Sequence, residues 1–423
     1  MIIVNDTISY LDTGDYFLKG CMVYDPKRLV SDKYRASCGD LQCNARYFTV
    51  RGVQLRVCCC ICKDLGMAGM RVLVTGVDGY IGAVLGPKLL EQGFEVVGMD
   101  CGFYRDGWLY NDLQPHPLTF TKDVRRITPK DVEGFDATVH LAELSNDPLG
   151  ELNERTTFDI NHVGSVTLAR ACKAAGVPRF IYTSSCSVYG AAGDGGERDE
   201  QSAPNPQTAY AKCKVLVERD VRALADTRFS PVLLRNATAF GVSPRMRFDI
   251  VLNNLAGFAW TTKQIRMTSD GTPWRPLVHV EDICQAVILA LKAPREAVHN
   301  EIFNVGDDAQ NYRIREIAAI VGQVFDGCSV SFGRPSGDNR SYRTSFGKIR
   351  RHLPDFSCRW PAEFGARQLR AIFERVGMTE QMFLFRGFTR LEQLKHLLAT
   401  RQIDNDFYWR PLEHGPSQEG YPA

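Results

Sequence analysis

The sequence has no long apolar run, little net charge and no signal-like N-terminus. No apolar segment is long enough to cross a bilayer, so we expect no membrane span. The 423 residues carry 51 Lys and Arg against 49 Asp and Glu, and a net charge of +2 gives no general reason to expect a nucleic-acid partner. The N-terminal stretch MIIVNDTISYLDTGDYF contains aspartates and no Lys or Arg, unlike a secretory signal. We therefore expect a cytoplasmic protein.

Cysteine is plentiful but unevenly placed. Of the 14 cysteines, seven lie in the first 62 residues and the others are scattered singly, which indicates reduced thiols and not a disulfide framework. A thiolate metal site is conceivable there, but the spacing matches no zinc pattern and the segment contains no histidine. We interpret residues 1–69 as a Cys-rich extension of unknown role without helical or strand periodicity, and we expect no metal. A functional start at Met67 or Met70 is the other interpretation.

Short apolar segments alternate with amphipathic ones from Met70 onward. This alternation predicts right-handed βαβ crossovers around a parallel sheet that is covered on both faces. The predicted strands are 70–76, 94–100, 136–142 and 179–185, and the predicted helices lie within 80–93 and 151–175. The fold class is therefore α/β, a Rossmann-type doubly wound parallel sheet with a smaller C-terminal substrate domain.

The same pattern divides the chain beyond the extension into three regions. We expect a dinucleotide-binding domain over 70–235, a substrate-binding domain over 236–375 with segments interleaved with the first, and a helical tail over 376–423. In that tail Leu391, Leu394, Leu397 and Leu398 fit one face of a helix. We interpret it as a packing helix, because its flanks lack the basic run of a membrane-surface helix.

Three glycines stand between the first predicted strand and its helix. Gly76, Gly79 and Gly82 permit a tight turn and let backbone N–H groups approach a pyrophosphate at the helix N-terminus. Asp100 ends the next strand, where a carboxylate can accept hydrogen bonds from the adenosine ribose and would repel a 2′-phosphate. This arrangement favours NAD over NADP, although Arg105 lies nearby.

A tyrosine and a lysine are spaced to share one helix face. Tyr210 and Lys214 lie four residues apart, so the phenol and the ammonium can approach the same point. A free tyrosine is a poor base at neutral pH, but a neighbouring ammonium and a positive nicotinamide ring would lower its pKa. Ser185, at the carboxyl end of its strand, could hydrogen-bond a substrate hydroxyl. The three residues predict oxidation or reduction of an alcohol.

Eight short motifs follow one another along the chain from the first glycine turn to residue 306. They are TGVDGYIG, the DV of Asp123–Val124, HLA at 140–142, NHVG at 161–164, TSSCSVYG, YAKCK, RPLVHVEDI at 275–283 and FNVG at 303–306. Through them the chain from about Met70 resembles the extended short-chain dehydrogenase/reductase family, the NAD-dependent nucleotide-sugar epimerases and dehydratases. The resemblance implies a nucleotide-diphosphate sugar as substrate and a homodimer, with the helix of Tyr210 as a contributor to its interface.

The resemblance also implies roles for individual residues. Tyr210 would be the general base, Lys214 its partner and ribose ligand, and Ser185 the hydroxyl-binding group, with Asn161 as a structural asparagine. The implied cofactor site consists of Gly76, Gly79, Tyr80, Ile81, Gly82, Asp100, Asp123, Val124, Leu141, Ala142 and Lys214. The predicted substrate site consists of Glu143, Ser185, Thr238, Arg245, Arg275 and Arg334, with Arg343 as an alternative to Arg334. Thr238 departs from the family pattern, because many relatives have a substrate-binding asparagine there. Arg247, in the same polar tract as Arg245, could also reach the diphosphate or the sugar. Arg275 resembles the arginine that binds the substrate diphosphate.

The two residues after Ser185 restrict the reactions that the site could catalyse. Sugar 4,6-dehydratases of this family have an Asp–Glu pair there, whereas this chain has Cys186 and Ser187, which cannot replace a carboxyl acid/base pair. Adjacent extended residues point to opposite faces, so we expect Cys186 to be a small buried residue. Glu143 follows HLA where the family has a small residue. It is either an added acid/base group or a loop carboxylate that points to solvent.

Three functional hypotheses remain from the sequence. The leading one is an NAD-dependent nucleotide-sugar epimerase, which oxidises the sugar to a ketosugar and returns hydride to the opposite face, at C4 in the simplest case. The alternative is an NAD(P)H-dependent nucleotide-ketosugar reductase, or a dehydratase that uses Glu143. The remote alternative is a non-catalytic dinucleotide-sensing scaffold, which has no physical need for Ser185, Tyr210 and Lys214 together.

Overall fold

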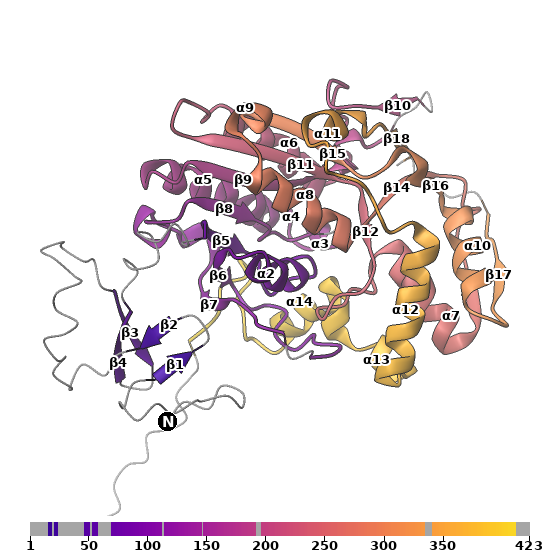
Figure 1. Cartoon of the computed structure of the whole chain (residues 1–423). Coiled ribbons are helices and arrows are strands. Elements are labelled where there is room, and N and C mark those ends of the chain that lie inside the picture. Colours follow the sequence, from indigo (N-terminus) through magenta and orange to yellow (C-terminus); the bar gives the residue numbers. More distant parts are fainter. Residues whose placement is uncertain are drawn as a thin grey trace, which may run out of the picture. The chain divides into compact units, whose positions relative to one another are not determined.

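The computed structural model describes two units of the chain, Met1–Gly69 and Met70–Ala423 (Figure 1). The described residues are 16–18, 21–23, 46–50, 53–57, 69–111, 114–145, 147–191, 196–334 and 341–411.

Four short strands make up the described part of the first unit. They form the antiparallel pairs β1 (Tyr16–Leu18) with β2 (Cys21–Val23), and β3 (Arg46–Val50) with β4 (Val53–Val57). Strands of three to five residues are too short to establish the sustained period that the sequence of this region lacks. Except for Cys21, the N-terminal cysteines lie outside the described residues.

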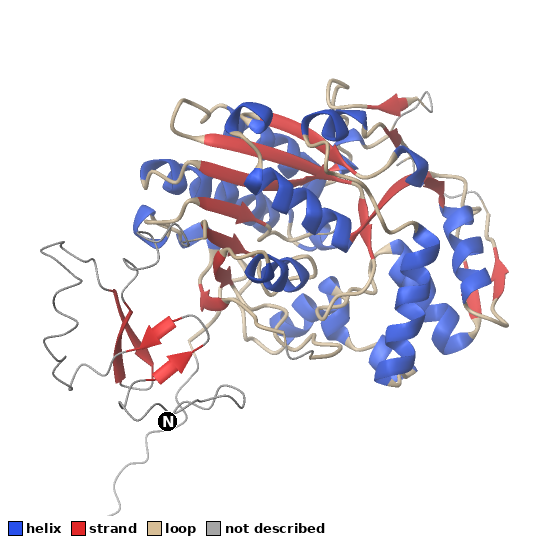
Figure 2. Ribbon diagram, in the orientation of Figure 1, coloured by secondary structure: helices blue, strands red, loops and turns tan. Residues whose placement is uncertain are grey.

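Seven parallel strands form the central sheet of the second unit (Figure 2). In spatial order they are β15 (Glu301–Val305), β11 (Ser230–Asn236), β9 (Arg179–Ser185), β8 (Ala137–His140), β5 (Arg71–Thr75), β6 (Glu95–Asp100) and β7 (Leu118–Thr121). The chain begins at β5, winds outward through β6 and β7, and then returns to build β8, β9, β11 and β15 on the other side. This order confirms the predicted doubly wound α/β fold, and it places a topological switch point between β5 and β8.

Side chains of the central strands alternate between two apolar cores. In β5, Val72 and Val74 pack in the core shared with α2 and α8, whereas Leu73 packs in the core shared with α5 and α6. The helices of this layer are α2 (Gly82–Glu91), α3 (Asp147–Leu152), α4 (Glu154–Thr157), the π-helical turn η4 (Phe158–Gly164), α5 (Ser165–Ala174), α6 (Ala209–Arg222), α8 (Val280–Lys292) and α9 (Arg295–Val298). The sheet is thus covered on both faces.

The smaller part of the second unit follows the carboxyl end of β11. Its strands are β12 (Thr238–Phe240), β14 (Trp274–His279) and β16 (Asn311–Arg313) in one sheet, with the pairs β13 (Gln264–Arg266) and β17 (Ser329–Ser331), and β10 (Glu197–Arg198) and β18 (Arg343–Thr344). Its helices are α7 (Val251–Thr262), α10 (Ile314–Val324), α11 (Gly347–His352) and α12 (Ala362–Val376). Because α8 and β15 return to the central layer between these elements, the two parts are interleaved in sequence.

The C-terminal segment, residues 377–411, contains α13 (Glu380–Phe383), the 3₁₀ turn η7 (Arg386–Phe388), α14 (Arg390–Ala399) and the residues that follow α14. Leu394 and Leu397 of α14 are 0% and 2% exposed and join the core that also contains α5 and α6. The prediction of a packing helix is therefore confirmed. None of the described helices is both long and apolar enough to cross a membrane.

Candidate active site

A cavity of about 510 Å³ lies at the carboxyl ends of the central strands. Most of the residues predicted for the cofactor and the substrate line it. They are Gly76, Gly79, Tyr80, Ile81, Gly82, Asp100, Asp123, Val124, Leu141, Ala142, Glu143, Ser185, Tyr210, Lys214, Thr238 and Arg275. The cavity is thus at the position where open α/β sheets bind their ligands.

The glycine turn has a backbone that other residues could not follow. Gly76 has a φ of +74°, and a Cβ there would lie 2.8 Å from the backbone nitrogen of Ala142. A Cβ on Gly82 would lie 2.3 Å from the carbonyl oxygen of Gly76. The turn leads directly into the N-terminus of α2, the end of a helix that favours an anion.

Asp100 is the last residue of β6 and Asp123 follows β7. Both line the same cavity. The carboxylate of Asp100 accepts backbone N–H groups from Gly102 at 2.7 Å and from Asp78 at 3.2 Å, and its pKa is raised because burial outweighs these bonds. Asp123 pairs with Arg125 at 2.5 Å. A glycine turn, a helix N-terminus and a carboxylate after the second strand fit a dinucleotide.

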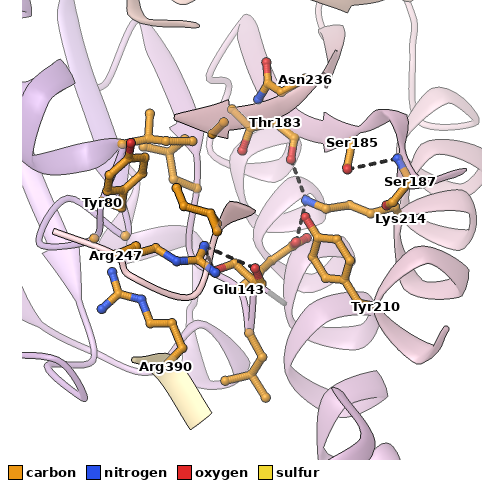
Figure 3. A pocket seen from close by; sticks show the side chains of 18 of the residues that line it. Tyr80, Glu143, Thr183, Ser185, Ser187, Tyr210, Lys214, Asn236, Arg247 and Arg390 are labelled. Atoms are coloured by element: carbon orange, nitrogen blue, oxygen red, sulfur yellow. Dashed lines mark hydrogen bonds and ion pairs between the residues drawn. The ribbon is translucent and has the colours of Figure 1, made fainter. Parts of the chain in front are cut away.

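Tyr210, Lys214 and Ser185 converge on the cavity, as Figure 3 shows. Thr208 begins α6 by accepting the N–H of Ala211, and the helix then carries Tyr210 and Lys214 on one face, with the Lys214 Nζ atom 5.4 Å from the centre of the Tyr210 ring. Burial raises the pKa of Tyr210, while Lys214 and a hydrogen bond with Ser185 act to lower it. The phenol is therefore held beside the two groups that favour its ionisation.

Glu143 forms a buried ion pair with the lysine. Its Oε2 atom lies 2.5 Å from the Nζ of Lys214, and the two side chains are only 3% and 5% exposed. The hydroxyl of Tyr182 donates to its Oε1 atom at 2.7 Å. Burial acts to lower the pKa of Lys214, but the charge of Glu143 overrides it and the pKa is raised. The interpretation of Glu143 as a solvent-facing loop carboxylate is therefore wrong, because its charge is compensated inside the protein.

The residues after Ser185 point in different directions. Cys186 is fully buried and its thiol donates to the carbonyl oxygen of Arg235 at 3.2 Å, which confirms the expectation of a buried residue. Ser187 lines the cavity instead. Its Oγ atom and the Oδ1 atom of Asn236 are buried and have no hydrogen-bond partner among the described residues. Both atoms are available to a polar ligand.

Asn161 fixes the loop that follows β8. Its amide oxygen accepts the backbone N–H of Leu144 at 2.8 Å, and its amide nitrogen donates to the carbonyl oxygen of Leu144 at 3.0 Å. The structural role implied for this asparagine is confirmed, because the loop it clamps carries Glu143.

Two predicted substrate arginines lie outside the cavity lining. The Nη1 atom of Arg245 donates to the backbone carbonyl oxygens of Tyr104 and Arg105, so this guanidinium stabilises a loop. Arg334 is exposed, as is the alternative, Arg343. These loops have no helical or strand periodicity, so the sequence could not show which of their arginines faces the cavity.

Two other arginines line the cavity in their place. Arg247, two residues after Arg245, pairs with Asp249 at 2.8 Å, and Arg390 belongs to the C-terminal helix α14. Arg247 belongs to the tract from which an arginine was expected to reach the diphosphate or the sugar, whereas no sequence signal identified Arg390. Within the described part of the chain, no cluster of three or more His, Cys, Asp and Glu side chains could hold a metal ion.

Comparison with known proteins places this site in a family. The model of the NAD dependent epimerase/dehydratase family matches residues 72–306. The chain is 26% identical over 340 residues to UDP-glucose 4-epimerase 1 of Oryza sativa subsp. japonica, which covers 70% of this chain and 92% of that protein.

Two solved structures share both the fold and part of the sequence. The dTDP-glucose 4,6-dehydratase DesIV of Streptomyces venezuelae, with NAD bound, has a TM-score of 0.64 at 26% identity and covers 74% of this chain and 100% of that one. MoeE5 in complex with UDP-glucose and NAD has a TM-score of 0.62 at 25% identity and covers 73% of this chain and 100% of that one. The chain therefore belongs to the NAD dependent epimerase/dehydratase family, as an enzyme whose cofactor is NAD.

Proposed function

We propose that the protein is a nucleotide-sugar epimerase that inverts C4 of its substrate by oxidation followed by reduction. NAD, held by the glycine turn and Asp100, would supply the hydride acceptor for the first half of this reaction and the hydride donor for the second. Tyr210 takes the proton of the sugar hydroxyl and later gives it back, while Ser185 orients that hydroxyl and Lys214 stabilises the phenolate. Protons and hydride balance over the cycle, so no cofactor is consumed.

The observation that carries this proposal is the missing acid/base pair after Ser185. Elimination of water from a sugar needs one group to remove a carbon-bound proton and another to protonate the departing hydroxyl. Cys186 is turned into the core and Ser187 has no acidic proton at useful pKa. Glu143 is held by Lys214 and Tyr182. Epimerisation needs only the groups that are in place.

A nucleotide-diphosphate sugar suits the remaining polar groups of the cavity. Sugar hydroxyls can satisfy the unpartnered atoms of Ser187 and Asn236, and Thr238 offers a further hydroxyl. Arg275, which also lines the cavity, carries the positive charge that a diphosphate requires. The similarity to a UDP-glucose 4-epimerase makes UDP-sugars the first candidates. A homodimer and a cytoplasmic location belong to the same proposal.

The test is a proton NMR time course in D₂O with UDP-, GDP-, CDP- and dTDP-sugars and added NAD. The expected result is a C4 epimer in which every carbon-bound proton is retained, because the hydride returns within the site. Tyr210→Phe is the matched control, since it removes one hydroxyl and leaves the ring that lines the cavity. Deuterium at C5 or C6 together with a 4-keto product would contradict the proposal.

Dehydration is the second candidate, and the carboxylate of Glu143 in the same cavity favours it. In that case Glu143 would have to leave Lys214 to remove the proton at C5. The similarity to a dTDP-glucose 4,6-dehydratase supports including dTDP-glucose in the panel. A ketosugar reductase would instead turn over only with reduced cofactor and release it oxidised.

A further inference from the structure

The C-terminal segment reaches back to the loops of the cofactor site. The indole nitrogen of Trp409 donates to the carbonyl oxygen of Cys101 at 2.7 Å, directly after β6. The Nη1 atom of Arg125, just after β7, donates to the carbonyl oxygen of Asp406 at 2.6 Å. Residues that follow α14 are thus fixed against the two loops whose carboxylates, Asp100 among them, face the cavity.

Arg390 is the residue of this segment that enters the cavity. It is 3% exposed, it lines the cavity, and its guanidinium lies 4.0 Å from the centre of the Tyr104 ring. Figure 3 shows it beside Arg247, on the Tyr80 side and away from Tyr210. Its backbone N–H donates to Asp249, but its guanidinium donates no hydrogen bond to any residue that the structure describes.

An unpaired buried guanidinium is unfavourable in the absence of a ligand. Charged groups that are nine-tenths buried are normally paired, as Arg247 is with Asp249 at 2.8 Å. Burial and the positive charge of Arg247 lower the pKa of Arg390, while Tyr104, Asp249 and Asp100 act to raise it. None of its five N–H donors bonds to an oxygen of the described residues, and donors at a cavity wall form a site for an anion that arrives with the ligand.

We propose that Arg390 binds the diphosphate of NAD, so that the C-terminal segment completes the cofactor site. The diphosphate is the anionic part of this dinucleotide, and a guanidinium matches two of its oxygens with parallel hydrogen bonds. The glycine turn offers backbone N–H groups to the same group but no formal charge, and Arg390 supplies that charge. Asp100 lies where the adenosine ribose binds, and its negative charge would repel an anion there.

The segment that carries Arg390 lies outside residues 72–306, which the family model matches. Arg390 is therefore not among the residues that this match includes. The contact does not depend on which sugar is the substrate or on which carbon reacts.

The experiment measures binding and not turnover. Isothermal titration calorimetry of the cofactor-stripped protein with adenosine, AMP, ADP, NAD and NADP would compare the wild type with Arg390→Gln. We expect the dissociation constants of ADP and NAD to rise roughly 10- to 100-fold, the loss of a charge-assisted hydrogen bond, while that of adenosine stays unchanged. Arg386→Gln is the matched control, because Arg386 does not line the cavity and pairs with Asp106 at 3.0 Å.

Thermal unfolding separates this role from a structural one. Arg390→Gln removes an unpaired buried charge, so its Tm without ligand should equal or exceed that of the wild type, while the Tm increase on adding NAD should shrink. Unchanged affinity for ADP and NAD, an equal loss for adenosine, or a lower Tm without ligand would each overturn the inference. So would a loss confined to NADP, which would assign Arg390 to a 2′-phosphate.

Discussion

Replacing Glu143 by glutamine should shift the pH dependence of catalysis to lower pH. Tyr210 acts as a base only when it is ionised, so kcat/KM rises as the pH passes through its pKa. The negative charge of Glu143 opposes a phenolate nearby and neutralises the ammonium of Lys214 at 2.5 Å. Glutamine keeps the shape and a hydrogen-bonding oxygen but removes the charge. Removal of the like charge lowers the pKa of Tyr210, provided that Lys214, whose own pKa Glu143 raises, keeps its proton.

The size of the shift follows from the charges in the site. A like charge at close range raises a pKa by roughly 1 to 3 units. We take the lower end, because the ammonium of Lys214 screens Glu143 in this ion pair. The acid limb of kcat/KM should therefore move down by about one pH unit, equivalent to about 1.4 kcal/mol in the ionisation of Tyr210.

The assay is the pH profile of kcat/KM, supported by a near-ultraviolet titration of the phenolate with the Tyr210→Phe spectrum subtracted. Tyr182→Phe is the matched control, since it removes the hydroxyl that donates to Glu143 at 2.7 Å and leaves the carboxylate charge in place. Its acid limb should not move. An unmoved or raised limb in Glu143→Gln, or equal shifts in both variants, would refute the electrostatic reasoning.

Three further substitutions test the site and its support. Tyr210→Phe should reduce turnover by roughly 10²- to 10⁴-fold, the usual contribution of a general base, without weakening NAD in calorimetry; a loss of binding would contradict its assignment as the base. Glu218→Ala should lower the free energy of unfolding by about 3–5 kcal/mol in urea titrations. In the wild type Glu218 pairs with the buried Arg235 at 2.6 Å, and the variant leaves that guanidinium without its carboxylate. A change below about 1 kcal/mol would be inconsistent with a buried pair. Gly76→Ala should destabilise the protein more than Gly93→Ala, as compared by Tm. Both positions have positive φ, but only the first added Cβ would meet a neighbour, and equal effects would show that the crowding at Gly76 is relieved at little cost.

Local patterns were sufficient to predict the central layer and the catalytic trio. The strand predicted over 70–76 is Arg71–Thr75, and the spacing of Tyr210 and Lys214 places both on one face of α6. These features depend on residues close together in the sequence or on motifs in a fixed order. They were predictable because short-range periodicity determines which side chains share a face.

The contacts that depend on tertiary structure could not be predicted in the same way. Glu143 follows β8 and Lys214 lies on α6, and only the packing of that helix against the sheet brings them to 2.5 Å. Arg390 is a charged residue at the start of a helix, a position that is usually exposed, and no periodicity marks it as buried. The side chains of Arg245 and Arg247 point in different directions because of the backbone geometry of their loop, which no periodicity in the sequence predicts.

The C-terminal segment also determines when the protein can finish folding during synthesis. The bond from Trp409 to Cys101 joins residues 308 positions apart, and Leu394 completes an apolar core with Phe103 and Val124. At about 5–20 residues per second, the ribosome makes the last of these partners on the order of tens of seconds after the first. Until then the apolar side chains beside the cofactor loops, such as Phe103 and Val124, stay exposed to solvent. The nascent chain is therefore exposed to aggregation for that interval, and full affinity for NAD should arise only after α14 and Trp409 have left the ribosome.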